Sequence, residues 1–448
     1  KKKPENVDRD IVTTPTFIIQ DILRQTVVEH CKNKTDKEIL SSSFADIACG
    51  SGAFLLETYQ LLQDTLVDFY LLNDHKRLIQ TAINTFKLPF AIKRKVLESC
   101  IFGIDKDYNA VQACKFGLLL KLLENEDNAT ITTPALPTLD QNIQFGNSLI
   151  ETSETNKKNQ NEINPFDFGK TRFDVVVGNP PYLATEHMKE FTPLELPIYK
   201  SKFNSSYKQF DKYFLFIERG LELLKEGGYF GYIVPSKFAK VGAGKKLREL
   251  LVDNKAIQQI ISFGANQVFQ NKTTYTCLLI LKKEKLEQVK YLEVNSLKNW
   301  KTRNIGSENF DEFNIDSLEV DGWVLYPSGI QTSANNVYIH SIEKKDKDFL
   351  YFTKDGIQWK VEETLTRPYF KTSSGDDNLY TYRPFLPNSF VIYPYLKTKK
   401  GIEFVEIDDL KANYPETYNF LNHYKDKLDN DKRDIKPEPE TKNEWYRY

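Results

Sequence analysis

Four consecutive residues, Asn179-Pro180-Pro181-Tyr182, follow an apolar run and combine groups that could act on an amine. The side-chain oxygen of Asn179 and the backbone carbonyl of Pro180 can each accept one N–H. Such acceptors suit the exocyclic amine of adenine, because they draw its delocalised nitrogen toward a tetrahedral geometry. The prolines stiffen the loop, and Tyr182 offers a flat face to an extruded base. The alternative is a rigid turn with Tyr182 packed in the core.

A glycine-rich turn is the second candidate site. Asp46 lies in a short apolar run, residues 44–48, and Gly50 and Gly52 follow this run before an amphipathic stretch begins. Glycines let the backbone pass close to a nucleotide-like ligand. Asp105 ends the next expected strand, where a carboxylate can accept both hydroxyls of a ribose. The alternatives are a simple strand-to-helix turn and, for Asp105, a helix cap, a role for which Asp107 competes.

These residues need elements that bring strand ends together. Short apolar runs alternate with helical patterns, which predicts an α/β fold with a doubly wound, Rossmann-like mixed sheet. We expect strands at 44–48, 101–104, 143–145, 173–177, 229–234, 257–262 and 275–281, and helices at 53–72, 76–100, 109–123, 213–224 and 245–251. Thr14-Pro15 is expected to cap a first helix. Gly227-Gly228 is expected to stop the helix at 213–224, and residues 183–209 to form a loop.

Length and composition limit the classes of protein. The chain has 448 residues, of which 40% are hydrophobic and 27% charged, as in a globular protein of two or three domains. The pattern changes near residue 288, so we expect a first domain at 1–288 and a smaller α+β domain at 289–448. Five scattered cysteines predict a reducing cytoplasm, and five His residues without ligand spacing predict no metal site. No apolar run approaches the roughly 18–20 residues that span a membrane.

The order of the motifs resembles that of the amino-methyltransferase family, specifically the adenine-N6 DNA methylases of the γ arrangement found in type II restriction–modification enzymes. The motifs, in chain order, are Thr13-Thr14-Pro15, the Asp46–Phe54 turn, Asp105, Gly146-Asn147, the Asn-Pro-Pro-Tyr loop, the Tyr213–Pro235 helix–strand unit and Val268-Phe269. The resemblance covers about residues 12–283 and, more loosely, the C-terminal part. It implies a methyltransferase fold, S-adenosyl-L-methionine as cofactor, and site-specific methylation of a flipped adenine in double-stranded DNA. It also implies that the protein acts in the bacterial cytoplasm or nucleoid.

The resemblance also implies roles for single residues. The methionine end of the cofactor would lie against Thr14 and Pro15, with its ammonium group on Asp46. Its approach to the backbone would be at Gly50 and Gly52, its ribose on Asp105, and its adenine on Asn147, where the family often has Asp. In the catalytic loop Asn179 to Tyr182, the target amine would donate to Asn179 and Pro180. Tyr182 and Phe269 would sandwich the flipped base, although Phe269 could equally be a core residue.

The C-terminal domain is expected to recognise the DNA target. Basic residues among Tyr and Phe are its candidates for phosphate and base contacts, namely Arg367, Lys371, Arg383, Lys397, Lys399 and Lys400. A solvated charged surface is the alternative for each. We recognise no metal-dependent nuclease motif, so any nuclease of the native protein is expected outside this chain. The missing initiator Met and the final Trp-Tyr-Arg-Tyr are typical of a piece of a longer protein.

Other functions fit parts of the same pattern. The Asn-Pro-Pro-Tyr loop also occurs in enzymes that methylate RNA or a glutamine amide of a protein, although a large domain after residue 290 favours DNA. A non-catalytic nucleic-acid-binding protein could retain a methylase fold, but the intact loop argues against it. A nicotinamide dehydrogenase would rest only on Gly50 and Gly52 and would leave the loop unexplained.

Overall fold

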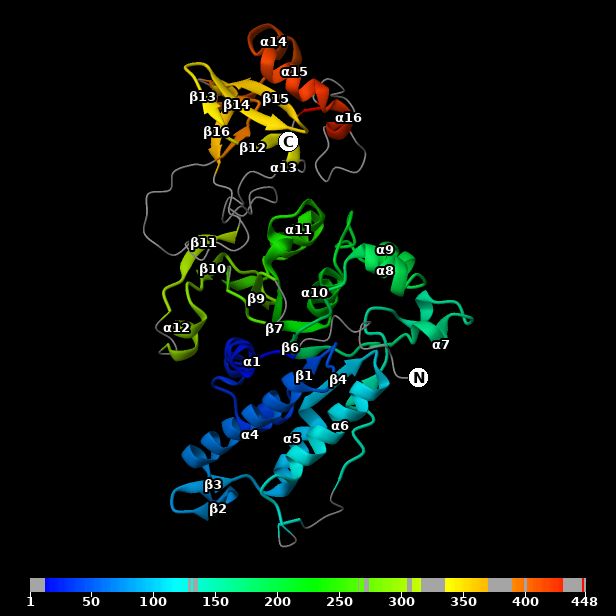
Figure 1. The fold of residues 1–448 in the computed structure, drawn as a ribbon. Coiled ribbons are helices and arrows are strands. Elements are labelled where there is room, and N and C mark those ends of the chain that lie inside the picture. The colour runs from blue at the N-terminus through cyan, green and yellow to red at the C-terminus, as the bar shows by residue number, and fades with distance from the viewer. Residues whose placement is uncertain are drawn as a thin grey trace. The chain divides into compact units, whose positions relative to one another are not determined.

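The computed structural model describes residues 13–127, 130–131, 136–264, 266–269, 274–303, 308–315, 335–369, 389–398, 401–429 and 445–446. The chain divides into two compact units, Lys1–Val324 and Leu325–Tyr448. Figure 1 shows the helices and strands of both units.

A nine-stranded sheet organises the first unit, in the order β11-β10-β8-β9-β7-β6-β1-β4-β5. Its strands are β1 (Phe44–Asp46), β4 (Ile101–Asp105), β5 (Ile143–Phe145), β6 (Phe173–Gly178), β7 (Leu224–Pro235), β8 (Ile257–Ser262), β9 (Thr276–Lys282), β10 (Gln288–Glu293) and β11 (Asp311–Asn314). The neighbours from β5 to β7 are parallel, whereas β9 runs antiparallel to both β7 and β8. The predicted mixed, doubly wound sheet is therefore confirmed.

Helices cover both faces of this sheet (Figure 1). They are α1 (Thr16–Leu23), the π-helix η1 (Arg24–Val28), α2 (Glu29–Cys31), α3 (Asp36–Leu40), α4 (Ala53–Asn73), α5 (Phe90–Cys100), α6 (Tyr108–Leu123), α7 (Gln160–Ile163), α8 (Thr185–Phe191), α9 (Leu196–Lys202), α10 (Lys212–Glu222), α11 (Lys245–Asp253) and α12 (Leu297–Thr302), with 3₁₀ turns η2 (His75–Arg77), η3 (Thr152–Glu154), η4 (Ser236–Ala239) and η5 (Gly242–Gly244).

Two neighbouring residues of β7 show which helices lie on opposite faces. A Cβ added at Gly231 would lie 2.7 Å from Ile22 of α1, so the sheet and α1 are in close contact there. A Cβ added to Gly220 of α10 would lie 2.3 Å from the ring of Phe230. Successive residues of a strand point to opposite faces. The helices α1 and α10 therefore pack on opposite sides of β7.

Three expectations about local structure are wrong. Residues 76–100 are not one helix, because Asn84 turns with φ of 58° between strands β2 (Ile79–Ala82) and β3 (Thr85–Lys87), and α5 begins only after Pro89. The expected loop 183–209 contains α8 and α9, whose Met188 and Tyr199 are fully buried. Gly227-Gly228 lies inside β7 and does not end a helix, since α10 already ends at Glu222.

The second unit is a small α+β structure. Its strands are β12 (Ile339–Ser341), β13 (Lys344–Lys345), β14 (Phe349–Lys354), β15 (Ile357–Glu362), β16 (Thr366–Tyr369), β17 (Ser389–Ile392), β18 (Tyr395–Thr398) and β19 (Gly401–Phe404), and its helices are α13 (Asn335–Tyr338), the 3₁₀ turn η7 (Glu363–Leu365), α14 (Ile407–Asn413), α15 (Pro415–His423) and α16 (Lys425–Leu428). Its sheets are antiparallel, β12-β17-β16, β13-β14-β15 and β18-β19. Aromatic rings fill its core, where His340 stacks on Phe352 at 4.1 Å.

The boundary between the two compact units lies later in the chain than the predicted boundary at 288/289. Strand β10 pairs parallel with β8, and β11 pairs antiparallel with β10. These strands extend the large sheet, so the first unit reaches Val324. Within the described ranges, no helix combines the length and apolarity needed to cross a bilayer.

Candidate active site

The predicted site residues of the first unit gather at one edge of the sheet. Asp46 and Asp105 end the neighbouring parallel strands β1 and β4, and Asn179 directly follows β6 on the other side of β1. The chain order reverses at β1, because β4 lies on one side of it and β6 on the other. In open α/β sheets, ligands bind outside the carboxyl ends of the strands at such a point.

The glycine-rich turn has the backbone that only glycine adopts readily. Gly50 has φ of 53° and Gly52 has φ of 91°, both in the left-handed region. A Cβ at Gly52 would lie 2.5 Å from the sulfur of Cys114, whereas a Cβ at Gly50 would meet no atom within 4 Å. Gly52 is therefore needed for packing against α6, and Gly50 leaves open space beside the backbone.

Asp107, and not Asp105, is the helix cap for which the two residues compete in the sequence. Asp107 is the N-cap of α6, and its carboxylate accepts from the backbone N–H groups of Asn109 (2.8 Å) and Ala110 (3.4 Å). Asp105 instead accepts from the backbone N–H of Gly50 at 2.8 Å. Burial raises the pKa of Asp105 against the opposing effect of backbone N–H donors. Its carboxylate is thus bound to the glycine-rich turn.

Asp46 is a buried carboxyl group at the end of β1, only 2% exposed. Burial raises its pKa to about 8, against the N–H of Ala48, which donates to it at 3.0 Å, and nearby Asp105 raises the pKa further. A Cβ at Gly178, the residue before Asn179, would lie 2.7 Å from Asp46 Oδ1. The end of β1, which carries Asp46, and the start of the Asn179–Tyr182 loop are therefore in direct contact.

Asn179 is held between the N-terminus and its own loop. Its Nδ2 donates to the Thr14 hydroxyl at 3.0 Å, and its Oδ1 accepts from the Tyr182 hydroxyl at 2.6 Å. The expectation that Thr14 caps α1 is wrong: Pro15 is the N-cap and makes no side-chain cap hydrogen bond. The Thr14 hydroxyl is bonded to the catalytic-loop candidate instead, which joins two motifs that lie 165 residues apart.

The Tyr182 ring is half-buried and the Phe269 ring is covered. The Tyr182 hydroxyl lies 2.8 Å from the carbonyl of Ile233, and its ring packs edge-to-face with Tyr213 at 5.8 Å. Phe269 is only 3% exposed, in the apolar cluster against which Tyr182 also packs. The ring of Phe269 would have to be uncovered before it could stack on a base.

A buried network around Asn147 was not foreseen. Asn147 Nδ2 donates to the Tyr199 hydroxyl at 3.5 Å, and that hydroxyl donates to Glu195 at 2.7 Å. Lys106 and Lys212 both pair with Glu195. Burial alone would raise the pKa of Glu195, but the two ammonium groups lower it overall. The strongest hint in the sequence is Lys106 directly after Asp105; Glu195 and Tyr199 lie in the segment expected to be a loop.

A second unforeseen pair lies beside the Asn179–Tyr182 loop. Asp211 is 4% exposed, and its backbone bridges to Ala184. Its Oδ2 accepts from the Lys237 ammonium at 2.8 Å, and its Oδ1 is a buried oxygen without a hydrogen-bond partner among the described residues. Buried, incompletely satisfied carboxylates are uncommon in folded proteins and are often functional.

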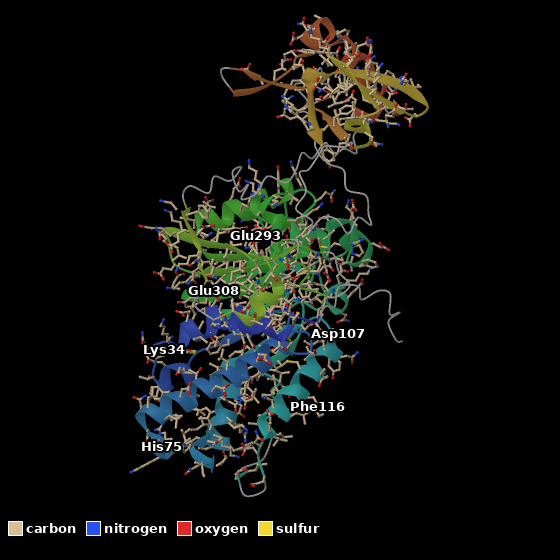
Figure 2. All side chains as sticks on the ribbon, turned by 60° about the vertical axis from the view of Figure 1, so that its left-hand side comes forward. Lys34, His75, Asp107, Phe116, Glu293 and Glu308 are labelled. Atoms are coloured by element: carbon tan, nitrogen blue, oxygen red, sulfur yellow. The ribbon has the colours of Figure 1, made fainter. Side chains whose placement is uncertain are left out.

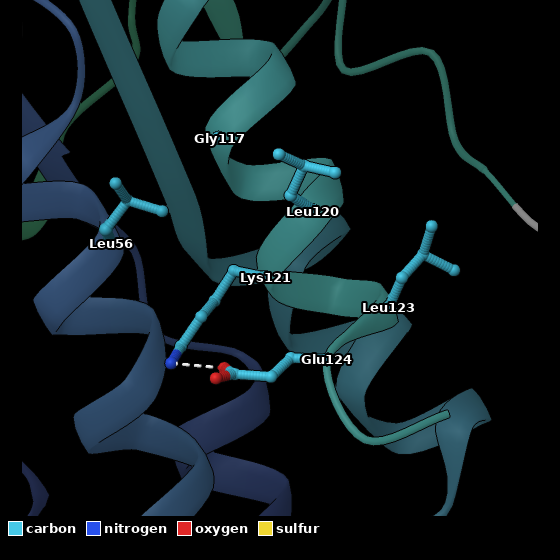
Figure 3. A pocket seen from close by; sticks show the side chains of 6 residues that line it. All are labelled: Leu56, Gly117, Leu120, Lys121, Leu123 and Glu124. Carbon is cyan, nitrogen blue, oxygen red and sulfur yellow. Dashed lines mark ion pairs between the residues drawn. The ribbon is translucent and has the colours of Figure 1, made fainter. Parts of the chain in front are cut away.

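A pocket elsewhere in the first unit is not part of this site. It is lined by Leu56 of α4 and by residues of α6 and its end, Gly117, Leu120, Lys121, Leu123 and Glu124 (Figure 3). Phe116 of α6 is 63% exposed, and Figure 2 shows it further along this helix than Asp107. The predicted site residues are absent from this lining, so the pocket gives no support for a cofactor site there.

Of the predicted DNA-reading side chains, only that of Arg367 lies within the described part of the structure. Lys371, Arg383, Lys399 and Lys400 lie outside the described residues, as does the side chain of Lys397. Arg367 is described: its guanidinium donates to the carbonyls of Thr364 (3.2 Å) and Thr366 (2.7 Å) and lies 5.1 Å from the ring of Tyr393. Arg367 therefore supports the local fold of the second unit.

Comparison with known proteins agrees with this arrangement. The sequence is 53% identical over 476 positions to the type II restriction enzyme and methyltransferase RM.Eco57I of Escherichia coli, covering 100% of this chain and 48% of that protein. It is 23% identical over 343 residues to the type II methyltransferase M.HindII of Haemophilus influenzae, covering 69% of this chain and 65% of that protein. The chain thus spans about half to two thirds of the length of these two relatives.

A solved structure shares the fold. A nuclease-deletion mutant of the Type ISP restriction–modification enzyme LlaGI, in complex with a DNA substrate mimic, superposes with a TM-score of 0.50 at 16% identity, covering 76% of this chain and 29% of that one. Residues 99–269, which contain Asp105, Asn147 and the Asn179–Tyr182 loop, match the family described as Eco57I restriction-modification methylase. Over residues 99–269 the chain is therefore similar to the Eco57I restriction-modification methylase family, in line with the resemblance of its motifs.

Proposed function

We propose that this chain is the methylase part of a restriction–modification enzyme and transfers a methyl group from S-adenosyl-L-methionine to the exocyclic amine of adenine in DNA. The observation that carries the proposal is the environment of Asn179. Its amide donates to the Thr14 hydroxyl on one side and accepts from the hydroxyl of the half-buried Tyr182 on the other. An oriented oxygen acceptor beside an aromatic ring suits an amine on a flat heterocycle.

The residues at the carboxyl edge fit the cofactor. Asp46 and Asp105 present two carboxyl groups for its ammonium group and its ribose, and Gly50 leaves room for its approach. Asn147 is held by the Tyr199–Glu195 pair at the end of the neighbouring strand, where an adenine would be recognised. The cofactor supplies a methyl group that is already activated on a sulfonium, so the protein has mainly to align and desolvate the reactants.

The catalytic loop orients the target amine. Asn179 Oδ1 and the carbonyl of Pro180 each accept one N–H, so the lone pair of the nitrogen is freed from the ring. Pro180 and Pro181 limit the backbone freedom of both acceptors. No strong base is needed before transfer, because the methylated amine is cationic and releases its proton afterwards.

The Tyr182 hydroxyl makes room for the amine at small cost. This hydroxyl has one proton and lies within hydrogen-bond distance of two acceptors, Asn179 Oδ1 and the Ile233 carbonyl. When an amine N–H reaches Asn179, the hydroxyl can keep its bond to Ile233. The acceptor that the reaction needs is therefore occupied before the base arrives and can be released without leaving the hydroxyl unpaired.

Removing the Tyr182 ring is expected to impair DNA use more than removing its hydroxyl. Base–aromatic stacking contributes about 1–3 kcal/mol per base, so Tyr182→Ala should raise the KM for DNA about 10- to 100-fold. Tyr182→Phe keeps the ring and should stay within a few-fold of wild type in steady-state methyl transfer. Equal losses in the two variants would instead assign the essential role to the hydroxyl.

Cofactor binding should strengthen as the pH rises from 6 to 8. The Asp46 pKa of about 8 means that the carboxyl is mostly protonated below that pH. Binding an ammonium group requires the carboxylate, so a proton must be released, and affinity should rise by up to about tenfold per pH unit. Calorimetry in buffers of different ionisation enthalpy should detect this proton at pH 7. An Asp46→Asn variant should bind weakly without this dependence; the same dependence in that variant would exclude Asp46 as its source.

Sequencing that detects methyladenine, applied to DNA incubated with the protein and cofactor, tests the proposal and reveals the recognition site. Parallel incubations of labelled cofactor with RNA and with a protein extract test the other substrates of such loops. Label in DNA at the adenine amine is the expected result. Label only in RNA or in glutamine amides would replace DNA as the substrate.

The remaining parts of the enzyme are assigned by the same proposal. The second unit would recognise the target sequence in double-stranded DNA. A nuclease would lie outside this chain, in a region equivalent to the part of the relative from Escherichia coli that the chain does not cover. The relative from Escherichia coli is both a restriction enzyme and a methyltransferase, and the chain covers 48% of it.

A further inference from the structure

A basic segment follows β7, and of its residues only Lys237 has been described so far, as the partner of Asp211. It runs from Ser236 to Arg248 through η4, η5 and the start of α11. Five of its thirteen residues are Lys or Arg, and none is Asp or Glu. The whole chain has a net charge of −1, so this local excess of positive charge is a property of the segment.

Hydrogen bonds from Arg248 and a tight turn at Gly244 fix the backbone of the basic segment. The buried guanidinium of Arg248 donates to the carbonyls of Phe238 (2.8 Å) and Val241 (2.9 Å). A Cβ at Gly244 would lie 2.1 Å from the carbonyl oxygen of Phe238, so the turn closes tightly there. The segment is therefore a preformed structure, and its lysines project from a fixed backbone.

Three lysines of the basic segment are exposed. The side chains of Lys237 and Lys246 are 50% and 47% exposed, and Lys240 is also exposed. Lys246 pairs with Glu249, an exposed-type helix pair that contributes little to stability. These ammonium groups are available to an anionic partner.

Lys237 connects the basic segment with the catalytic loop. The carbonyls of Ile233 and Pro235, at the end of β7, accept from the hydroxyls of Tyr182 and Tyr213. Two residues later, the Lys237 ammonium donates to Asp211, whose backbone bridges to Ala184 in the chain that leaves Tyr182. An ammonium has three donors, and Asp211 accepts from one of them. Asp211 thus orients Lys237 beside the loop and leaves donors for a second anion.

We propose that the basic segment binds the phosphates of the DNA strand that carries the target base, with Lys237 next to the extruded nucleotide. The inference rests on the proposed function, because it names the partner of the same site. Phosphate contacts position a protein on DNA without reading sequence. A rigid row of lysines next to the Asn179–Tyr182 loop would hold the strand while its base occupies that loop.

A triple variant, Lys237→Gln with Lys240→Gln and Lys246→Gln, tests the proposal against a matched control. The control changes Lys76, Lys95 and Lys285 to Gln; these are exposed lysines of η2, of α5 and of the turn after β9, so both variants lose the same charge. DNA binding is measured by fluorescence anisotropy over a range of salt concentrations. The slope of log K against log salt is negative, and each lost phosphate contact reduces its magnitude by about 0.9.

In the triple variant, the magnitude of that slope should fall by up to about 2.7. Its dissociation constant for S-adenosyl-L-methionine should stay at the wild-type value. The control should keep the wild-type slope. Because removing Lys237 leaves the buried Asp211 without its partner, the double variant of Lys240 and Lys246 serves as a folded test with two thirds of the effect. The single variant Lys237→Arg keeps a positive charge beside Asp211 and should keep the phosphate contact and the wild-type slope.

Two outcomes separate the inference from the proposed function. If the wild-type protein methylates DNA and the triple and double variants keep its salt slope, the basic segment does not bind the strand and only the inference fails. If the slope falls as expected but the wild-type protein methylates no DNA, the phosphate contacts stand and the proposed chemistry fails.

Discussion

Asn179→Ala is expected to lower the kcat of methyl transfer by about 10²- to 10³-fold, the usual cost of removing one oriented hydrogen-bonding group that acts in the transition state. The loss arises because the amine nitrogen keeps its lone pair in the ring when one of its two acceptors is missing. The cofactor dissociation constant should stay close to that of wild type, since the Asn179 side chain is hydrogen-bonded to Thr14 and Tyr182, whereas the carboxyl groups proposed to bind the cofactor's ammonium and ribose are at the ends of β1 and β4. Single-turnover kinetics with labelled cofactor, together with calorimetry, measure the two quantities separately.

Thr14→Val is the matched control for this prediction. The substitution removes the Thr14 hydroxyl, which accepts from Asn179 Nδ2 at 3.0 Å. It keeps Asn179 Oδ1, the proposed acceptor for the target amine. We expect a smaller loss in kcat than for Asn179→Ala, because the amide can still turn toward the amine. If Asn179→Ala retained wild-type turnover, Asn179 would not be the acceptor and the proposed mechanism would fall.

Asp105→Ala is expected to weaken cofactor binding by at least about 100-fold. Hydrogen bonds to a charged group contribute about 1.5–3 kcal/mol each, and a ribose offers two hydroxyls. The variant also frees the N–H of Gly50, which donates to Asp105 at 2.8 Å, so the turn that faces the cofactor loses its anchor. Calorimetric titration with S-adenosyl-L-methionine measures the change.

Asp107→Ala separates cofactor binding from helix capping. This residue lies two positions away and caps α6, so its loss should cost about 0.5–2 kcal/mol of stability, read from thermal unfolding, with little change in cofactor affinity. Unchanged affinity in Asp105→Ala, or equal weakening in both variants, would remove Asp105 from the ribose site.

The sheet and the position of the site were predictable for one physical reason. Buried parallel strands appear as short apolar runs, and those at β1, β4, β5 and β6 each end in, or are followed by, a polar or glycine residue at the edge where parallel strands end. The chain therefore shows both the strand and the site residue next to it. The roles of these residues in cofactor and base binding stay predictions.

What could not be predicted depends on contacts between distant segments. The helices α8 and α9 are short, and burial of Met188 and Tyr199 stabilises them where the local sequence pattern does not. The Asn147–Tyr199–Glu195 network and the Asp211–Lys237 pair join residues from separate elements, and a single sequence shows no spacing between them. Thr14 was misjudged because a threonine before a proline is typical of a helix start, whereas its hydroxyl is bonded to Asn179.

The contact between Gly178 and Asp46 has a consequence for engineering. A side chain at position 178 would enter the space of the Asp46 carboxyl, since even its first carbon would lie 2.7 Å from Oδ1. A designer who enlarges or reshapes the substrate side at this position would displace the group assigned to the cofactor's ammonium. Selectivity for the acceptor and affinity for the donor cannot be tuned independently there, so altered target chemistry has to be sought on the Tyr182 side of the loop.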